Sequence, residues 1–280
     1  MKIDYHVHLE EGPYSANWIG RTANALEFFM KDKTYSYKWM QSLMTKLNKR
    51  VKEEEYSEYW LDLYLERAKE VGIVDHLYRF HDTLDYYEKH IYLESDKLGN
   101  IQRKWLNQVS VIPSMNQFIE FIQSQKEKWE KQGVQLKLGI EADFFPNGEE
   151  ELEKLITCKP WDYVIGSVHF INGWGFDNPE GAYIFEKVNL MKLYKIHTSY
   201  VCQAIESQLF DIAAHLDNLK VFCYRPDEKL LQSCYEKVAS SLRNHNIATE
   251  LNTGLSYRAP IEEACPSPDT CRRWQNIISR

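Results

Sequence analysis

Apolar and polar residues follow two different periods along this chain, and the two periods predict strands and helices. In "IDYHVH" (3–8), apolar residues alternate with polar ones that include His6 and His8, which is the period-two pattern of a strand. In "NQFIEFIQSQKEKWEKQG" (116–133), apolar residues recur every three or four positions, and Gly133 ends the predicted helix. Because alternate residues of a strand share a face, we expect His6 and His8 to project together.

The same two patterns assign the rest of the chain. Residues 16 to about 70 are helical in character, "GIVDHLY" (72–78) is a short strand, and 79–113 combine loop and helix. After residue 133, strands and helices alternate. The predicted strands are 134–145, 162–171, 210–217 and 247–254, and the predicted helices are 148–158, 189–208, 227–245 and 267–280. This alternation predicts an α/β fold whose parallel strands form a closed or nearly closed barrel.

The length of the chain suits one domain of this kind. It has 280 residues, and α/β barrels commonly run to roughly 250 residues as a single domain. We therefore expect one barrel domain over residues 1–280. A charged, amphipathic stretch at about 20–65 is expected to be a helical insertion on the surface of that domain.

Charge and composition narrow the classes of function. The chain carries 34 Lys and Arg against 41 Asp and Glu, a net charge of −7, so we expect no nucleic-acid partner. It shows no amino-terminal signal pattern and no apolar run of the ~18 residues that a membrane helix needs, so we expect a soluble, cytoplasmic protein without a membrane partner. The six cysteines form no C-x-x-C pair and are expected to be small buried hydrophobic residues.

Polar residues that could carry chemistry occur at the predicted strand ends. They are His6 and His8, Asp75 and His76, Glu141 and Asp143, His169, His215 and Asp217, and Glu250 and Asn252, with Asp211 as a strand residue that could approach them. In a parallel barrel, the carboxyl ends of the strands lie on one face, where loops can vary without disturbing the core. We therefore expect these side chains to meet in one site.

The composition of this set is typical of metal ligands. Imidazole and carboxylate without thiolate favour Zn²⁺, Mn²⁺ or Fe²⁺ over a structural cysteine site. The set is too rich in histidine for one ion, so we expect two or three divalent metal ions, bridged by Glu141. Such a cluster suits hydrolysis of a phosphate ester by a metal-activated hydroxide, with further metal charge on the phosphoryl and leaving oxygens.

The segments that contain these residues resemble a known family. "DYHVH", "VDH", "GIEADFF", "DYVIGSVHF" with "GWGFDNP", "DIAAHLD" and "ELNTG" occur in the order used by the polymerase-and-histidinol-phosphatase (PHP) superfamily. They are most similar to its histidinol-phosphate phosphatase branch. The resemblance covers nearly the whole chain outside the predicted insertion. It implies a distorted (β/α)₇ barrel similar to a TIM barrel, a trinuclear metal site and phosphomonoesterase activity.

The resemblance also implies roles for individual residues. The implied metal ligands are His6 and His8 on a first ion, Glu141 bridging to a second ion, His169 and His215 on the second, and His76 on a third. The family uses one further ligand in the loop after the first strand. Here Glu10 is the preferred candidate, with Glu11 as the alternative.

One part of the family pattern is absent from this sequence. Members normally carry an Asp-x-His pair on a last strand, which supplies ligands to the first and third metals. No Asp-x-His follows residue 252, and "CRRWQNIISR" resembles the helix that precedes that strand. We expect either a truncated sequence or a barrel without its closing strand, in which the third metal is weakly held.

Several residues are candidates for handling the substrate. Arg79 and Arg258, in predicted loops at the active-site end, are the candidates for binding a phosphate group. His81 is a candidate general acid for the leaving oxygen, and Glu141 is the carboxylate expected at the catalytic centre. These four residues complete the predicted active site.

Other aromatic residues and histidines are assigned less specific roles. Trp174 and Phe176 either line the pocket or pack in the core. His197 lies on the apolar side of its predicted helix and is expected to be a packed residue. His245 precedes a strand at the wrong end for chemistry, and no partner for His90 is visible in the sequence.

The leading hypothesis is a metal-dependent enzyme that hydrolyses a small phosphomonoester, with histidinol phosphate as the first candidate. One alternative is a phosphatase of the same superfamily that acts on phosphotyrosine or another phosphoester. The other is a catalytically weak metal-binding or scaffold protein, which the absent Asp-x-His favours. Metal content and hydrolysis of p-nitrophenyl phosphate with added Mn²⁺ would separate these hypotheses.

Overall fold

The computed structural model describes residues 3–8, 69–254 and 263–278, which divide into two compact units. Unit 1 comprises the described residues up to Asp75 together with 116–137. Unit 2 comprises 76–115 and the described residues from Leu138 onward. The predicted insertion at about 20–65 lies outside the described residues, and the single domain over 1–280 stays a prediction.

Unit 1 contains a parallel strand pair. β1 (Ile3–His8) pairs with β2 (Glu70–Val74), so that Ile3 lies opposite Glu70 and His8 lies opposite Val74. The register shifts between Asp4 and Val7, which is the behaviour of a β-bulge. β2 begins two residues earlier than the strand predicted at 72–78. It ends at Val74, before residues 77–79 form a turn of 3₁₀ helix.

The predicted amphipathic helix forms the other part of unit 1. α6 (Met115–Glu130) ends before Gly133, whose φ of 79° is a left-handed conformation that glycine adopts without strain. Phe118 and Ile122, four residues apart on this helix, are fully buried. The chain then enters β3 (Gln135–Asp143), where the Gln135 N–H donates to the carbonyl of Lys69 at 2.9 Å.

Unit 2 contains parallel strands in the order β3-β4-β7-β8. The remaining three strands are β4 (Tyr163–Ser167), β7 (Ile212–Ala213) and β8 (Ala248–Thr249). In β3 and β4, Gly139 lies opposite Tyr163 and Asp143 lies opposite Ser167. The predicted α/β class with parallel strands is confirmed. Each of these four strands is shorter than the strand predicted from the sequence.

The strand predicted over 162–171 is shorter because its last part turns away into a separate hairpin. β5 (Phe170–Ile171) and β6 (Trp174–Gly175) pair in antiparallel fashion across Asn172 and Gly173. These two residues have φ values of 51° and 77°, as in a type I′ turn. A Cβ at Gly173 would lie 2.6 Å from the backbone nitrogen of Tyr92, so only glycine fits. The hairpin thus starts directly after His169.

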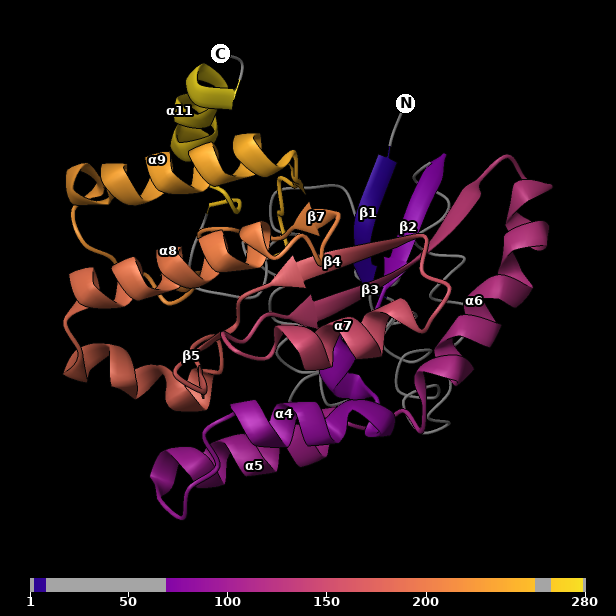
Figure 1. Cartoon of the computed structure of the whole chain (residues 1–280), viewed down its shortest axis with the longest axis horizontal. Helices are drawn as coiled ribbons and strands as arrows, with labels where there is room; N and C mark the ends of the chain where they lie inside the picture. The colour runs from indigo at the N-terminus through magenta and orange to yellow at the C-terminus, as the bar shows by residue number, and fades with distance from the viewer. Residues whose placement is uncertain (1–2, 9–68, 255–262, 279–280) are drawn as a thin grey trace, which may run out of the picture. The chain divides into compact units, whose positions relative to one another are not determined.

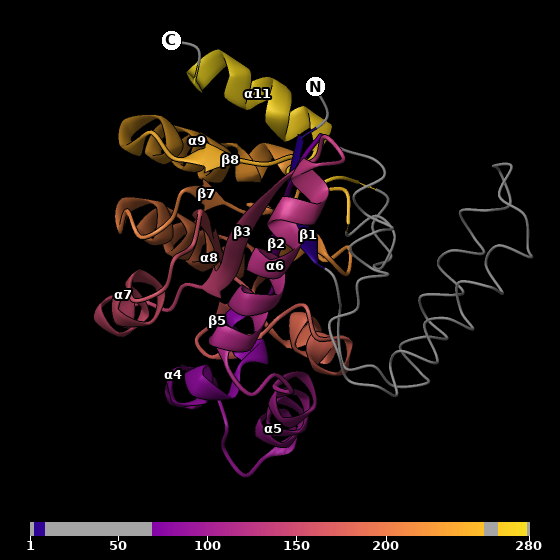
Figure 2. The same ribbon diagram turned by 90° about the vertical axis from the view of Figure 1, so that its right-hand side faces the viewer.

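Helices account for most of the remaining residues of unit 2. They are α4 (Leu84–His90), α5 (Lys97–Val109), α7 (Glu149–Thr157), α8 (Leu190–Glu206), α9 (Glu228–His245) and α11 (Pro268–Ile278), with 3₁₀ segments at Leu77–Arg79, His81–Thr83, Pro179–Lys187 and Asn218–Lys220. Side chains cap several of them: Asn189 accepts from the Lys192 N–H at the start of α8. Helices α8 and α9 lie side by side, and α11 packs on α9 (Figures 1 and 2).

An aromatic and aliphatic core in unit 2 decides the role of two residues. Trp174 and Phe176 are buried together with Phe185, and the Trp174 and Phe185 rings have centroids 4.9 Å apart. Leu219 and Tyr235 belong to the same buried cluster. Of the two readings of Trp174 and Phe176, packing is therefore the one that the structure supports.

The prediction that all six cysteines are buried is wrong for two of them. Cys234 and Cys265 are buried as expected, whereas Cys158 and Cys223 are exposed. Cys158 directly follows the last residue of α7, and Cys223 lies in a turn with a φ of 63°, so neither sits on the apolar face of an element. Both positions lie at the edge of an apolar run, where the sequence pattern does not determine burial.

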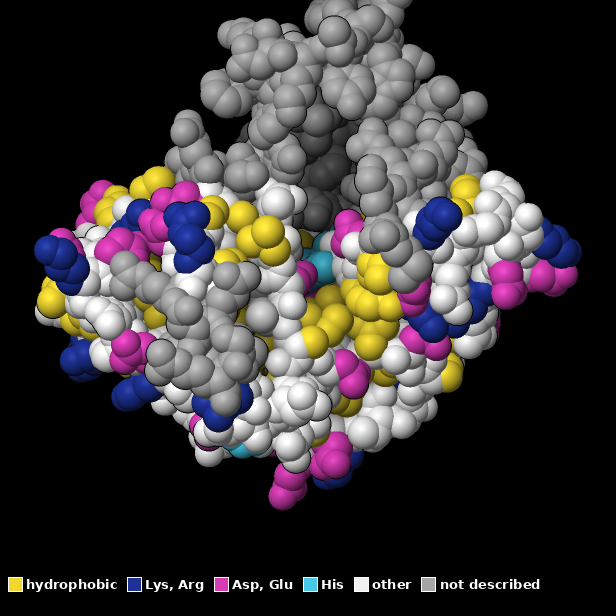
Figure 3. Space-filling view, turned by 90° about the horizontal axis from the view of Figure 1, so that it is seen from above, with side chains coloured by type: hydrophobic (Ala, Val, Ile, Leu, Met, Phe, Trp, Pro, Cys, Tyr) yellow, Lys and Arg dark blue, Asp and Glu magenta, His cyan; other side chains and the backbone are white. Residues whose placement is uncertain are grey.

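The surface of the described residues mixes both signs of charge. On the face shown in Figure 3, Lys and Arg side chains are interspersed with Asp and Glu side chains. In the part of the chain that the structure describes, no helix is both long enough and apolar enough to cross a membrane.

A buried ion pair links the turn after β7 to the segment before α11. Lys220 is only 1% exposed, and its Nζ donates to Asp217 Oδ2 at 2.7 Å and to the Ala264 carbonyl at 2.8 Å. The same Asp217 oxygen accepts from the Ser267 N–H at 2.9 Å. This cluster therefore holds two segments together that lie about fifty residues apart in the sequence.

Replacing Lys220 by methionine should destabilise the protein strongly. The Asp217 carboxylate would stay buried without its cation, and breaking a buried pair in this way costs about 3–5 kcal/mol. Urea unfolding followed by circular dichroism measures the change in the free energy of unfolding. Lys131→Met is the matched control, because Lys131 pairs with Glu127 on the exposed surface of unit 1, and a change of about 0.5 kcal/mol or less is expected. Equal losses in the two variants would contradict the assignment.

Candidate metal centre

Three histidines of unit 2 occupy equivalent positions after three strands. His76, His169 and His215 each lie two residues beyond the last residue of β2, β4 and β7, respectively. Alternate residues of an extended chain point to the same side, so the extended His76 continues the side-chain pattern of its strand. Glu141 comes from β3, opposite His76 in the ladder.

The Glu141 carboxylate is the centre of the cluster. It is 1% exposed. Its Oε2 lies 3.0 Å from His76 Nδ1, while its Oε1 lies 3.0 Å from His215 Nε2 and 3.8 Å from His169 Nε2. The Ser167 hydroxyl donates to Oε1 as well. One buried carboxylate is thus shared by three imidazoles and a hydroxyl group.

These donors fit a divalent metal ion. One ligand atom from each of His76, Glu141 and His169 lies within 4.8 Å of the others. Two imidazole nitrogens and a carboxylate oxygen without thiolate are a donor set that Zn²⁺, Mn²⁺ and Fe²⁺ accept. The geometry therefore agrees with the ligand types expected from the sequence.

The orientation of His169 is set by a buried carboxylate. His169 Nδ1 lies 2.7 Å from Asp143 Oδ1, and Asp143 Oδ2 accepts from the Tyr87 hydroxyl at 2.9 Å. Burial disfavours the charged imidazole, but the charge and hydrogen bond of Asp143 outweigh it and raise the pKa of His169 to about 9. A carboxylate on the outer nitrogen directs Nε2 towards Glu141, as in many histidine ligands of metals.

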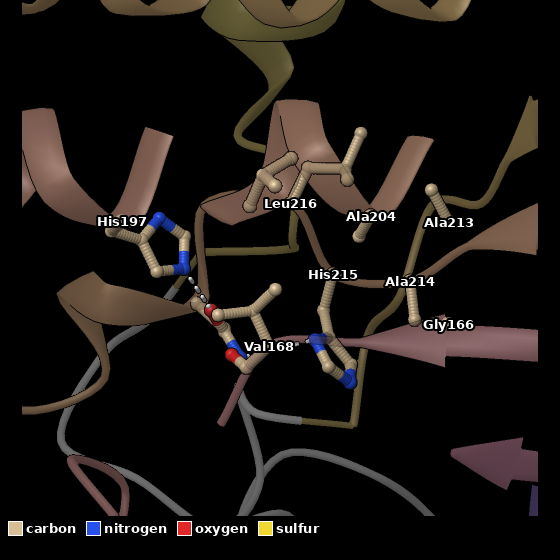
Figure 4. A pocket seen from close by; sticks show the side chains of 10 residues that line it. Gly166, Val168, His197, Ala204, Ala213, Ala214, His215 and Leu216 are labelled. Atoms are coloured by element: carbon tan, nitrogen blue, oxygen red, sulfur yellow. Dashed lines mark hydrogen bonds between the residues drawn. The ribbon is translucent and has the colours of Figure 1, made fainter. Parts of the chain in front are cut away.

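The outer nitrogen of His215 contacts a neutral amide instead. His215 Nδ1 lies 3.1 Å from Asn218 Nδ2, on the wall of a small cavity lined also by His197 and Ala204 of α8 (Figure 4). The backbone of His215 has a φ of 26°, an uncommon value for a residue with a side chain. Its N–H donates to Glu250 Oε1 at 3.1 Å.

An aromatic ring stacks on the third histidine. The His76 ring stacks on Tyr78, with centroids 4.5 Å apart and an angle of 13° between the planes. Tyr78 in turn contacts Trp105 of α5 edge to face at 4.8 Å. The three imidazoles therefore have different neighbours besides Glu141: Asp143 for His169, Asn218 for His215 and Tyr78 for His76.

In unit 1, the two histidines of β1 converge as expected. His6 Nε2 and His8 Nε2 lie 3.1 Å apart, and the ring centroids are 5.1 Å apart. The prediction that these side chains project together is confirmed. Two imidazole nitrogens at this distance can act as neighbouring ligands of one ion.

The chain carries the sequence pattern of a known domain family. The model of the PHP domain matches residues 68–254, about two thirds of the chain. The chain belongs to the PHP domain family. The matched residues contain His76, Glu141, His169 and His215, the four side chains of the cluster.

Relatives of this PHP domain include proteins named as histidinol phosphatases. A "Probable histidinol-phosphatase" from Deinococcus radiodurans is 40% identical over 140 residues, which is 50% of this chain and 52% of the relative. The alignment thus spans about half the length of the curated relative.

Two solved structures share the fold of this PHP domain at low sequence identity. A candidate histidinol phosphatase from Listeria monocytogenes superposes with a TM-score of 0.63 and 13% identity, covering 99% of this chain and 91% of that one. A histidinol phosphate phosphatase from Lactococcus lactis, complexed with zinc, L-histidinol and phosphate, superposes with a TM-score of 0.57 and 13% identity. That alignment covers 99% of this chain and 79% of the Lactococcus lactis chain. At this identity the likeness shows the fold, and it confirms the PHP-type fold expected from the sequence.

Other predicted site residues lie outside the cluster or outside the described residues. Glu10 and Arg258 lie outside the described residues. Arg79 is 1% exposed, so it is enclosed rather than placed on an open loop. His81 is exposed, and its Nε2 lies 3.1 Å from the Ser110 carbonyl. The roles of these four residues stay predictions.

The expectation that Asp211 could approach the site is wrong. Its Oδ2 accepts from the backbone N–H of Val164 at 2.8 Å, and Val164 lies near the beginning of β4. Glu141, His169 and His215 lie at the opposite ends of their strands. Asp211 therefore serves to fix the start of a strand.

The three histidines that were not predicted to belong to the site have other contacts in the structure. His197 is buried in α8, as expected, and its Nε2 lies 3.1 Å from Asn218 Oδ1. His90 lies 3.4 Å from Glu151 and stacks on Phe145. His245 Nδ1 contacts the Ser241 carbonyl at 3.0 Å, within its own helix.

Three residues that contact the cluster were not given an individual role from the sequence: Asp143, Tyr87 and Asn218. Asp143 carried a signal, because it lies two residues after Glu141 and therefore on the same face of β3. Tyr87 and Asn218 carried none, because they reach the site from α4 and from the turn after β7. Their contacts depend on how distant segments pack.

The buried His197 should make this PHP domain less stable at acidic pH. Burial lowers the pKa of His197 to about 4, whereas an unfolded histidine titrates near 6.5. Between these values the unfolded chain binds the additional proton, so stability rises with pH. The contribution of His197 is therefore complete above about pH 6.5 and is lost as the pH falls towards 4.

His197→Gln tests this pH dependence. Glutamine keeps a donor for Asn218 but does not titrate, so the loss of unfolding free energy between about pH 6.5 and 4 should shrink by up to about 3 kcal/mol. Urea unfolding in the presence of a chelator measures it. Thr198→Val, a non-titrating change of a buried neighbour, should shift stability equally at all pH values. An unchanged pH slope in His197→Gln would contradict the prediction.

Proposed function

We propose that this protein is a metal-dependent phosphomonoesterase that hydrolyses a small phosphate ester. The observation that carries the proposal is the shared Glu141 carboxylate, buried among His76, His169 and His215 in a PHP domain. A cluster of three imidazoles around one carboxylate has a clear chemical use as a set of metal ligands.

Individual residues would have different roles in binding the metal ions. Glu141 would bridge two ions, His169 and His215 would hold the second ion and His76 a third, and His6 and His8 are expected to hold the first ion from the family resemblance. Divalent ions lower the pKa of water to generate a nucleophile near neutral pH and neutralise charge on the phosphoryl oxygens. Asp143 would keep Nε2 of His169 directed at the ion, and Ser167 would hold one oxygen of Glu141 in place.

Histidinol phosphate is the first candidate substrate. The Deinococcus radiodurans relative is named as a histidinol-phosphatase, and the Lactococcus lactis structure contains L-histidinol and phosphate, the two products of such a hydrolysis. The proposal therefore includes a small phosphorylated molecule as the partner of the site, with Arg79 and Arg258 as the predicted contacts for the phosphate group.

Removing the metal should abolish hydrolysis, and adding it back should restore hydrolysis. The protein is dialysed against a chelator, its metal content is measured by mass spectrometry, and Zn²⁺, Mn²⁺ or Fe²⁺ is returned in separate samples. Release of inorganic phosphate from histidinol phosphate is then followed. Hydrolysis that continues at an undiminished rate in metal-depleted protein would rule out the metal-dependent mechanism.

Replacing Glu141 by glutamine should reduce kcat by roughly 100-fold or more. The substitution removes the charge that is shared by the cluster, and even outer-shell partners of metal ligands are worth about 10–100-fold. Glu153→Gln is the matched control, because Glu153 is an exposed carboxylate on α7 and its removal should leave kcat unchanged. Similar rates for Glu141→Gln and the unmodified protein would contradict a catalytic role of Glu141.

A substrate panel decides between the candidate activities. Histidinol phosphate, phosphotyrosine and p-nitrophenyl phosphate are compared by kcat/KM with the same metal-loaded protein. The highest value for histidinol phosphate is expected. A preference for phosphotyrosine would reassign the substrate, and bound metal without turnover of any phosphoester would favour a metal-binding scaffold.

A further inference from the structure

We propose that Tyr87 is a positioning residue, whose hydroxyl holds the Asp143 carboxylate in the orientation that directs His169 at a metal ion. Asp143 and His169 lie between Tyr87 and the predicted ion, so Tyr87 acts through two groups in series. The inference rests on the metal-binding role of His169 in the proposed function. It adds a residue from α4 for which neither the sequence pattern nor the family resemblance suggested a role.

The donors and acceptors in this series leave Nε2 of His169 available for an ion. His169 Nδ1 lies 2.7 Å from Asp143 Oδ1, and a carboxylate can only accept, so the proton of the neutral ring lies on Nδ1. The lone pair of Nε2 then faces Glu141, whose Oε1 is 3.8 Å away. The Tyr87 hydroxyl donates to the other Asp143 oxygen, Oδ2, at 2.9 Å. Each group therefore has the partner that it needs when His169 is a metal ligand.

The Asp143 carboxylate depends on the donor that Tyr87 supplies. Asp143 is 1% exposed, so water does not replace a lost partner. Among the described residues, the structure gives Oδ2 no hydrogen-bond donor other than Tyr87. Burial and the negative charge of Asp143 raise the pKa of Tyr87 well above its ordinary value, so its hydroxyl stays protonated and can donate. Without this hydroxyl, the carboxylate would lose the contact that sets its rotation about the Cβ–Cγ bond.

The ring of Tyr87 is itself held by other aromatic rings. Tyr87 is fully buried, and its ring lies edge to face with Tyr78 at 5.8 Å and with Phe145 at 5.9 Å between centroids. The ring of Phe170, the residue after His169, lies 6.5 Å away. Three neighbouring rings therefore fix the place of the hydroxyl, and a phenylalanine in place of Tyr87 would keep this packing.

The preceding residue on α4 offers a matched comparison. Consecutive residues of a helix point roughly 100° apart, so Tyr86 and Tyr87 reach different atoms of Asp143. The Tyr86 hydroxyl donates to the backbone carbonyl of Asp143 at 3.0 Å, whereas the Tyr87 hydroxyl donates to the carboxylate. Both side chains are buried, so each phenylalanine variant removes one buried hydroxyl and one hydrogen bond. The variants differ in whether the carboxylate loses its partner.

The test measures zinc affinity in the full chain, independently of hydrolysis. Competition with a chromophoric chelator gives the affinity of each ion, and His169→Ala identifies the ion that depends on this ligand. Tyr87→Phe should weaken that same ion about 10-fold, the lower end of the range for the outer partners of metal ligands. Tyr86→Phe should leave zinc affinity unchanged, although it loses a buried hydrogen bond of similar length.

A double-mutant cycle tests whether Tyr87 acts through the carboxylate. Asp143→Ala should itself weaken the ion about 10–100-fold. In the Asp143→Ala protein, Tyr87→Phe should cause no further loss, because the carboxylate on which the hydroxyl acts has been removed. A purely structural role of the hydroxyl predicts instead that Tyr87→Phe lowers zinc affinity equally in both backgrounds, and this result would refute the inference.

A second measurement covers the case in which Asp143→Ala folds poorly. Absorption of the Co²⁺-substituted protein in the visible range reports the geometry of the metal ligands. The spectrum should change in Tyr87→Phe and stay as in the unmodified protein in Tyr86→Phe. Identical spectra for the two variants would count against the inference.

The outcomes separate this inference from the proposed function. Equal zinc affinity in Tyr87→Phe and Tyr86→Phe would overturn the inference while leaving the phosphatase proposal intact. Zinc binding that is weakened by Tyr87→Phe, in a protein whose unmodified form hydrolyses no phosphoester, would uphold the inference and overturn the phosphatase proposal. An unmodified protein that binds no zinc in competition with the chelator would overturn both.

Discussion

The cluster depends on the burial of one negative charge. Moving an isolated carboxylate out of water is costly unless hydrogen bonds and positive or polar partners replace the water. Glu141, two residues before the end of β3, is 1% exposed and obtains these partners from His76, His215 and Ser167, which follow or end three other strands. Because these partners come from separate segments, the ends of several strands have to lie close to Glu141 in the native state.

Much of this arrangement could be predicted from the sequence, because it follows from local periodicity and from parallel strands. His76, His169 and His215 all lie in the segments that the period-two pattern assigned to strands, and each lies two residues beyond the end of a strand in the structure. Parallel strands place their carboxyl ends on the same edge, so residues in these positions meet. The α/β class and the convergence of His6 and His8 in β1 followed from the same two rules.

The remainder could not be predicted, because it depends on contacts between segments that are distant in the sequence. The Asp143 carboxylate was visible on β3, but its use depended on Tyr87, which reaches it from α4 across 56 positions. Asp211 is a carboxylate beside a predicted strand, as a metal ligand would be. It nevertheless lies at the other end of its strand and fixes the start of β4. Trp174 and Phe176 follow His169 closely, but the type I′ hairpin turns both rings into the core. In each case the residue type could be read from the sequence, but the direction in which the side chain points could not be predicted from it.

The outer partners of the imidazoles show how charge is distributed over the cluster. Two carboxylates, Glu141 and Asp143, already lie within hydrogen-bonding distance of His169 or its neighbours, and their charge favours the protonated form of that ring. A third carboxylate at the outer nitrogen of His215 would add negative charge where two buried charges already require compensation. Asn218 provides the hydrogen bond without the charge, and Tyr78 provides a flat ring surface beside His76. Of the three imidazoles, His169 alone lies within hydrogen-bonding distance of Asp143 as well as close to Glu141, among the described residues. The charge of bound cations, rather than that of additional side chains, would then balance Glu141 and Asp143.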